Sequence, residues 1–498
     1  MRKFYLLIGI VFGFHLASSQ NKSGEYPGVE NISGSMIMKH ISFFASEPLE
    51  GRMPAGNGYN KAANYAAEYF KLHGLIPYAK NSYFQDVPVE YNEFNGPIKL
   101  EKIEQGKVVQ TYTLGSDFIC RGFSGKGKFT ASVVFCGYGL SIPEINYDDY
   151  ANVDVKGKIV LVFKQNPAWA KDVTGIGEIM TRYRANLAAM HGAKAILFVT
   201  TPNMLNPQKP IGSIMDGKGI QNPDFPQMQI SLELADALLR KTGKNLIEIQ
   251  KQIDAFKKPF CVETGDSLHI EVNTKYEKER LTKNIIAVLP GTDDVLKNEY
   301  MIIGAHLDHV GKQDGLFFPG ANDNASGSAA VLEIASAFVK SGISFKRTII
   351  FVLFTSEELG MLGSKYFVEH TPVPLEKVVA MFNLDCIGHG DSIQVGGGIS
   401  SPQLWKKTCH FDSVYTKLLI PKSGNGGGAD AQPFFDKGIP TLYFASKYSY
   451  TYLHLPGDTP ETLNPDLLEK MAKLAYLIAA DVANGNYTKE KLPANSAK

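Results

Sequence analysis

The carboxyl-terminal half of the chain alternates short apolar runs with stretches of helical periodicity. The apolar runs cover residues 284–291, 300–306, 348–355, 378–385 and 440–445. Each is short, rich in β-branched or aromatic residues and bounded by polar segments, which predicts buried strands. Strands separated by helices form a mostly parallel sheet whose faces the helices cover. We therefore expect an α/β fold with a mostly parallel, mixed sheet that is flanked by helices.

Ionisable side chains follow several of these predicted strands at the point where each strand stops. Because the carboxyl ends of parallel strands open on one crevice, these side chains are expected to meet there. Any one of them alone is more often a cap or a satisfied polar group, but their joint placement supplies nitrogen and oxygen ligands suited to zinc. The set comprises His306, Asp308, His309, Asp323, Glu357, Glu358 and Asp385.

The middle of the chain has a different pattern. Strand-like runs at 132–140, 157–163 and 193–200 surround one helical stretch at 182–191, which predicts a smaller β-rich domain. The expected division is a signal peptide at 1–19, the amino-terminal part of the catalytic domain at 20–120, an insert at 121–275, the catalytic domain at 276–485 and a polar tail at 486–498.

The first twenty residues have the pattern of a targeting signal. Arg2 and Lys3 precede an apolar run from Phe4 to Phe14, and small residues follow at Ala17–Ser19. The run is too short to span a bilayer, so a retained membrane anchor is the weaker alternative. We expect an exported protein, periplasmic or secreted, without stable membrane insertion.

Two amphipathic helices are predicted near the amino terminus, at 36–44 and 59–72, and a terminal helix at 467–483. The glycine-rich loop between the first two contains Arg52. A loop arginine of this kind could touch a substrate, but we expect it to be solvated.

Composition narrows the function classes. The chain has 498 residues, of which 44% are hydrophobic, so it can build more than one core. Its net charge of +1 argues against nucleic acid as a partner. The five cysteines are scattered without a CxxC motif, which argues against a thiolate metal site. A serine hydrolase is excluded because no G-x-S-x-G elbow lies between a strand and a helix.

The catalytic half resembles the M28 family of co-catalytic zinc aminopeptidases, in the form with an inserted protease-associated domain. The stretches that carry the resemblance are NIIAVLPG, GAHLDHVG, GANDNASG, SEELGMLGS, NLDCIG, ADAQPF and HLPGDTPE. The middle of the chain, with GYGL, YDDYANVDVKGKIVLVF and HGAKAILFV, is similar to the protease-associated insert, and LEGRMPAGNGYNKAANYAAEYF is similar to the segment before it.

The resemblance implies a role for each of these positions. His306 and Asp385 would hold one Zn²⁺, and Glu358 and His454 would hold a second Zn²⁺. Asp323 would bridge the two ions, which a carboxylate with two oxygens can do. Glu357 would be the general base, and Asp308 would orient His306. The implied function is an exported di-zinc metallopeptidase that removes amino-terminal residues from peptides by attack of a metal-activated water.

One departure and two alternatives qualify this interpretation. Ala431 stands where the family often has a histidine, which affects the expected substrate contacts but not the metals. A glutaminyl cyclase with one zinc is the first alternative, and a metal-free binding protein on the same fold is the second. We also expect the insert to lie beside the crevice and to limit which substrates enter it. The tyrosine-rich segment 448–452, which leads into His454, is expected to favour apolar or bulky amino-terminal residues of the substrate.

Overall fold

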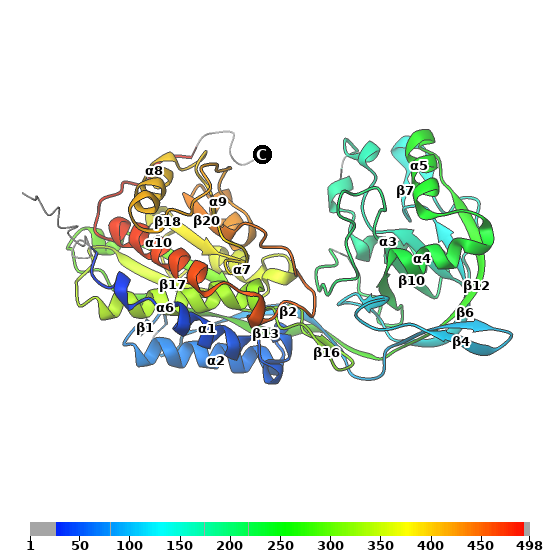
Figure 1. The fold of residues 1–498 in the computed structure, drawn as a ribbon, viewed down its shortest axis with the longest axis horizontal. Helices are drawn as coiled ribbons and strands as arrows, with labels where there is room; N and C mark the ends of the chain where they lie inside the picture. The colour runs from blue at the N-terminus through cyan, green and yellow to red at the C-terminus, as the bar shows by residue number, and fades with distance from the viewer. Residues whose placement is uncertain (1–25, 80, 174, 218, 493–498) are drawn as a thin grey trace, which may run out of the picture.

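The computed structural model describes residues 26–79, 81–173, 175–217 and 219–492, so the expected signal peptide lies outside the described residues. The chain forms two lobes side by side, and the long strands β2 (Phe84–Phe94) and β13 (Thr274–Leu289) run from the first lobe toward the second (Figure 1). Within the described ranges, no helix combines the length and the apolar character needed to cross a membrane.

The first lobe is built on an eight-stranded mixed sheet. Its order is β1 (Ile76–Pro77), β13, β17 (Thr348–Phe354), β14 (Tyr300–His306), β18 (Val378–Leu384), β20 (Thr441–Ser446) and β19 (Ile393–Gly396), and β2 pairs with β13. The four strands β17, β14, β18 and β20 are parallel, and the outer pairs are antiparallel. The expected α/β fold with a mixed sheet flanked by helices is confirmed. The run at 284–291 forms the end of β13, which pairs with β17 in the antiparallel direction and not in the parallel direction of the central strands.

Helices cover both faces of this sheet. Alternate residues of each strand point to opposite faces, so Ile303 and Phe351 pack with one set of helices, and Ile302 and Val352 pack with the other. The first set comprises α1 (Gly34–Phe44), α2 (Asn57–Leu72), α6 (Gly327–Lys340) and α10 (Pro465–Ala483), and the second comprises α7 (Leu362–Glu369) and α9 (Gln432–Asp436). The central strands β14, β17 and β18 are mostly apolar, and almost all of their residues are buried.

The strand register brings the carboxyl ends of three strands to one edge of the sheet. His306 at the end of β14 pairs with Phe354 of β17, and Gly304 pairs with Asn383 of β18. The residues that follow these strands therefore emerge beside one another, as expected for a ligand crevice in an open α/β sheet.

The second lobe contains its own eight-stranded sheet and its own apolar cores. The order is β4 (Lys107–Thr111), β3 (Lys99–Glu104), β12 (Cys261–Val272), β6 (Gly127–Cys136), β9 (Ile159–Phe163), β10 (Ala195–Val199), β11 (Gln227–Ile230) and β5 (Phe118–Cys120). Helices α3 (Thr181–Met190), α4 (Leu232–Leu239) and α5 (Leu246–Phe256) complete it. Since β3, β4 and β5 precede residue 121, the expected start of the insert, the division into domains stays a prediction.

Two short hairpins and helix α8 complete the regular strands and α-helices of the described residues, and short helical turns lie between the elements. The hairpins pair β7 (Ser141–Ile142) with β8 (Tyr147–Asp148), and β15 (Lys312–Gln313) with β16 (Leu316–Phe317), and the helix is α8 (Pro402–Phe411).

Candidate active site

The site lies where the parallel strands of the first lobe end. His306 is the last residue of β14, and Asp385 directly follows β18. Glu357 and Glu358 begin a short turn after β17, and Asp323 lies in the turn Ala321–Ser326 that leads into α6. The long loop between β20 and α10 supplies His454. The structure thus brings together all five residues that the sequence proposes as metal ligands, with both proposed catalytic residues beside them.

These side chains form two groups whose nitrogen and oxygen atoms lie close enough to share an ion. One group is His306, Asp323 and Asp385, and the other is His309, Asp323, Glu358 and His454. His306 Nε2 lies 3.3 Å from Asp323 Oδ1 and 3.3 Å from Asp385 Oδ1. His454 Nε2 lies 3.1 Å from Asp323 Oδ2 and 3.1 Å from Glu358 Oε2. Asp323 therefore offers a different oxygen to each group.

His309 is the residue of the site to which the sequence assigns no role. Its Nδ1 lies 3.0 Å from Glu358 Oε1 and 3.9 Å from Asp323 Oδ2, and its side chain is fully buried. The available signal was its position one residue after Asp308, at the end of the same strand. Through Glu358, His309 can fix the carboxylate that faces His454.

The donor set fits divalent metal ions. Three carboxylates and three imidazoles converge in a buried space, and buried carboxylates need opposite charge. Asp385 Oδ1 and His309 Nε2 are buried and make no hydrogen bond with the described residues. Imidazole nitrogen and carboxylate oxygen are the ligands of co-catalytic zinc sites, so this chemistry matches the expected metal.

The charges of the site shift its pKa values in opposite directions. Burial alone would raise the pKa of Asp323, but hydrogen bonds from His306 and His454 outweigh burial and hold it well below its usual range. Burial likewise opposes ionisation of Glu358, yet the charge of His454 lowers the pKa of Glu358 to about 2. Both carboxyl groups are therefore ionised and able to act as ligands at neutral pH.

Glu357 behaves differently from its neighbour Glu358. Its side chain lines the cleft but belongs to neither ligand group. Burial, with a further contribution from the charge of Glu358, raises the pKa of Glu357 well above its usual value although His306 opposes this. A carboxylate with a raised pKa is suited to accept a proton near neutral pH.

Asp308 supports this part of the site through its backbone and its side chain. His306 Nδ1 lies 3.2 Å from the carbonyl oxygen of Asp308 and 3.8 Å from its carboxylate. The carboxylate accepts the backbone N–H groups of Glu357 at 3.1 Å and of Glu358 at 3.2 Å. Burial raises the pKa of Asp308 to about 7.

The expectation that Arg52 is solvated is wrong. Its side chain is completely buried, and its guanidinium donates to the carbonyl oxygens of Phe44, Leu307, Pro319 and Gly320 at 2.7–2.8 Å. Leu307 stands between His306 and Asp308, and Gly320 is three residues before Asp323. Arg52 therefore ties together the two loops that carry metal-group residues, because its planar fork can reach four carbonyl oxygens at once.

The cleft above the ligand groups is lined by both lobes. Met215 comes from the second lobe, and Tyr443, Tyr450 and Leu453 come from β20 and the loop that carries His454. The Tyr443 hydroxyl donates to Asp385 Oδ2 at 3.0 Å. Ala431, at the position where a histidine was expected from the resemblance, lies in the apolar core and not in the cleft.

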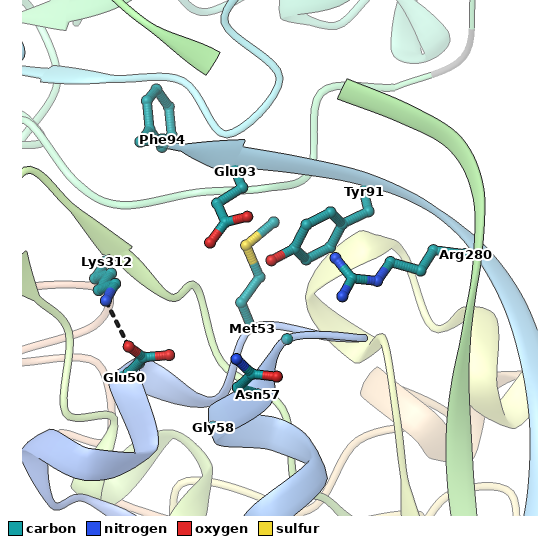
Figure 2. A pocket seen from close by; sticks show the side chains of 10 residues that line it. Glu50, Met53, Asn57, Gly58, Tyr91, Glu93, Phe94, Arg280 and Lys312 are labelled. Atoms are coloured by element: carbon teal, nitrogen blue, oxygen red, sulfur yellow. Dashed lines mark hydrogen bonds and ion pairs between the residues drawn. The ribbon is translucent and has the colours of Figure 1, made fainter. Parts of the chain in front are cut away.

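A second pocket of about 80 Å³ lies at the start of α2 and contains none of these site residues. Figure 2 shows its charged groups: Lys312 pairs with Glu50 at 2.5 Å, and the Arg280 guanidinium lies over the Tyr91 ring at 4.1 Å. None of the residues that line this pocket belongs to the two ligand groups.

Comparison with protein families identifies the part of the chain that holds this site. Residues 284–479 match the model of peptidase family M28. This segment belongs to peptidase family M28. It includes every residue of the two ligand groups, together with Glu357 and Asp308. The M28 segment therefore supplies the complete donor set, and Met215 lies before it in the sequence.

Curated relatives extend the comparison beyond this segment. A glutamate carboxypeptidase 2 homolog of Caenorhabditis briggsae is 24% identical over 87% of the chain. A probable leucine aminopeptidase of Trichophyton verrucosum is 31% identical over 40% of the chain. The chain spans 65% and 57% of the lengths of these two relatives.

A solved aminopeptidase structure shares the fold of both lobes. An aminopeptidase from Aneurinibacillus sp. strain AM-1 superposes with a TM-score of 0.64 at 20% identity, covering 93% of this chain and 96% of that chain. At this level of identity the likeness concerns the fold, and it extends well beyond residues 284–479.

Proposed function

We propose that this protein is a di-zinc aminopeptidase that removes amino-terminal residues from peptides. The observation that carries the proposal is the position of Asp323, which offers Oδ1 to His306 and Oδ2 to His454 at 3.3 and 3.1 Å. A carboxylate shared in this way is the arrangement that a pair of co-catalytic ions requires. The M28 match and the leucine aminopeptidase relative support the same reaction class.

The two ligand groups divide the expected ions between them. His306 and Asp385 would hold one zinc, Glu358 and His454 would hold the other, and Asp323 would bridge them. Zinc ions held there would supply Lewis-acid polarisation of a peptide carbonyl and would lower the pKa of a water molecule. Glu357 lines the same cleft outside both groups, so its carboxylate is placed to take a proton from the attacking water and to return it to the leaving amine.

The charge of the cleft favours the amino end of a peptide over the carboxyl end. Four carboxylates line it, from Asp323, Glu357, Glu358 and Asp385, and no lysine or arginine lines it in the part of the chain that the structure describes. Asp323, Glu358 and Asp385 would be used by the metal ions, so Glu357 is the carboxylate of the cleft that stays free to attract an α-ammonium group. A carboxyl-terminal carboxylate would find no lysine or arginine side chain to pair with among the described residues that line the cleft. This argument supports an aminopeptidase although one relative carries the name of a carboxypeptidase.

The walls of the cleft support a preference for apolar or bulky amino-terminal side chains. Tyr443, Tyr450, Leu453 and Met215 surround the carboxylates, and the cleft holds about 340 Å³. Aromatic and thioether side chains bind apolar groups through dispersion and water exclusion. Export to the periplasm or outside the cell remains part of the proposal and depends on the sequence of residues 1–19.

The proposal is tested on purified protein with matched peptides. Peptides with a free amino terminus should be cleaved one residue at a time, and the same peptides with an acetylated amino terminus should be resistant. Elemental analysis should find about two zinc ions per chain, and chelators should abolish activity. One zinc with cyclisation of amino-terminal glutamine would instead identify a glutaminyl cyclase, and no metal with no hydrolysis would identify a binding protein. A preference for acidic or glycine amino termini would contradict the role of the tyrosine-lined wall.

A further inference from the structure

A segment of the second lobe, residues 212–216, reaches the last expected metal ligand of the first lobe. His454 Nδ1 lies 2.9 Å from the carbonyl oxygen of Gly212, and the Gly212 N–H donates to the carbonyl oxygen of His454 at 3.0 Å. The two residues are 242 positions apart in the sequence. They exchange two hydrogen bonds, one through the imidazole ring and one through the backbone.

This contact determines which ring nitrogen of His454 carries the proton. A carbonyl oxygen only accepts, so Nδ1 must carry the hydrogen that is donated to Gly212. Nε2, which faces Asp323 and Glu358 at 3.1 Å, is therefore the nitrogen that would give up its hydrogen and offer a lone pair to a metal. A hydrogen bond from the second ring nitrogen fixes both the tautomer and the ring orientation of a histidine ligand. Gly212 therefore prepares His454 for a metal on its other side.

The conformation of His454 also needs support from outside its own loop. Its φ is +55°, in the left-handed region that residues other than glycine rarely adopt. Residues held there persist only where surrounding contacts fix them. The pair of hydrogen bonds to Gly212 supplies such contacts.

The other end of the segment is anchored in the body of the second lobe. The carboxylate of Asp216 accepts from Arg121 Nε at 3.0 Å, Arg121 Nη2 at 2.8 Å, Thr181 Oγ1 at 2.9 Å and the Phe123 N–H at 3.1 Å. Arg121 also donates to the carbonyl oxygen of Met215 at 2.9 Å. Both Arg121 and Asp216 are buried, so the segment moves with the second lobe and not with the loop that carries His454.

Close packing explains why a glycine faces His454. A Cβ added to Gly212 would lie 2.7 Å from Val310 Cγ2 and 3.1 Å from Phe318 Cε1, both of which belong to the first lobe. The first of these distances is too short for two carbon atoms, so an alanine would push the segment away from the first lobe. The backbone of Gly212 can approach His454 only because it has no side chain.

We propose that residues 212–216 are a positioning element for His454, so that the metal group of His454, Glu358 and Asp323 is complete only when the second lobe is docked. This inference rests on the proposed function in that it requires a metal in that group. It goes further because the binding affinity of only one of the two expected ions would depend on the second lobe. Within the described ranges, the hydrogen bonds and ion pairs of His306 and Asp385 all go to first-lobe residues, so the affinity of that side should be independent of residues 212–216.

The test compares two glycine-to-alanine variants within the second lobe. Gly212→Ala introduces the clash with Val310. Gly177→Ala is the matched control, because Gly177 is exposed, lies outside the left-handed region and has nothing within 4 Å of an added Cβ. Metal-free protein is titrated with zinc by calorimetry. Gly212→Ala should lose about 10- to 100-fold in affinity for one of two ions, the usual effect of removing the partner of a ligand, whereas Gly177→Ala should match the wild type.

A rescue variant separates positioning from general damage. Val310→Ala combined with Gly212→Ala removes the 2.7 Å contact and should restore most of the lost zinc affinity. Equal loss at both ions, unchanged affinity in Gly212→Ala, or no recovery in the double variant would each overturn the inference. Failure of the proposed function has a different signature, because wild-type protein would then bind fewer than two ions or would not cleave peptides.

Discussion

The carboxylate of Asp308 accepts the backbone N–H group of Glu357 at 3.1 Å. Its other oxygen accepts the N–H of Glu358 at 3.2 Å, so one buried side chain holds both residues of the turn after β17. Because of this turn, Glu358 points into the group with His454, while Glu357 stays in the cleft outside both groups. The division of labour between two adjacent glutamates therefore depends on Asp308.

Asp308→Asn is expected to lower kcat/KM by about 10- to 100-fold while both zinc ions remain bound. Asparagine can accept one of the two N–H groups, but its NH₂ group then faces the other N–H, which shifts the turn. Small displacements of catalytic groups cost rates of this order. Steady-state kinetics and elemental analysis of the same preparation provide the measurement. Asp391→Asn, an exposed carboxylate in the first lobe, is the control. A rate within twofold of wild type would show that Asp308 does not position Glu357.

Glu357→Gln should keep both zinc ions and lose at least about a hundredfold in kcat, the usual scale for a general base. Glu358→Ala should instead lose the ion on the His454 side, because it removes the carboxylate that lies 3.1 Å from His454 Nε2. Metal content and single-turnover rates of both variants provide the measurement. Equal metal content in the two variants would mean that the roles assigned to the pair are wrong.

Arg52→Met should destabilise the first lobe by about 3–5 kcal/mol, the cost of breaking a buried charged network. The substitution removes four hydrogen bonds to carbonyl oxygens at 2.7–2.8 Å and leaves those oxygens buried. Arg280→Met is the control, because Arg280 is half-buried and contacts the Tyr91 ring instead (Figure 2).

The chain has two tryptophans, Trp169 in the second lobe and Trp405 in the first. Urea unfolding in a Trp169→Phe background therefore reports the first lobe through Trp405 fluorescence. A loss below about 1 kcal/mol would contradict this role of Arg52.

Most strands and helices of the first lobe can be predicted from the sequence, because the patterns that mark them lie within each segment. The strands β14, β17 and β18 are buried on both faces, so each appears in the sequence as a mostly apolar run. Their polar residues follow at once, because ligands of an open sheet lie at strand ends. The helices α1, α2 and α10 likewise match the predicted periodic segments to within two residues at each end.

The parts that the sequence does not reveal depend on distant contacts. Strand β4 is exposed throughout and has no apolar alternation to mark it. Arg52 has the sequence context of a loop arginine, and its partners Leu307, Pro319 and Gly320 are more than 250 positions away. The contact between Gly212 and His454 joins residues 242 positions apart, and on the Gly212 side it uses backbone atoms, which every residue has. The Arg52 contacts form only when the first lobe folds, and the Gly212 contact forms only when the two lobes meet.

Asp149 gives the second lobe a stability that depends on pH. The side chain is 1% exposed, accepts the N–H groups of Tyr138 and Leu140 at 3.0 Å, and accepts the Tyr147 hydroxyl at 2.8 Å. Burial raises its pKa from the ordinary 3.8 to about 7, although these hydrogen bonds oppose the shift. The folded state therefore holds a proton that the unfolded state releases between about pH 4 and 7. The stabilisation is fully present below about pH 4 and is lost as the pH rises through about 7.

Asp149→Asn should remove this dependence, because an amide does not ionise. Its oxygen can accept both backbone N–H groups, and its NH₂ group can donate to the Tyr147 hydroxyl oxygen, so the fold of the loop is kept. The free energy of unfolding of the wild-type second lobe, relative to the variant, should fall by a few kcal/mol between pH 4 and pH 8, since each pKa unit corresponds to about 1.4 kcal/mol. Urea unfolding followed by Trp169 fluorescence in a Trp405→Phe background measures this difference. The first lobe, followed through Trp405, is the internal control and should show no difference between the two proteins. Parallel pH profiles of the second lobe in wild type and variant would show that Asp149 ionises in the folded state as readily as in the unfolded one.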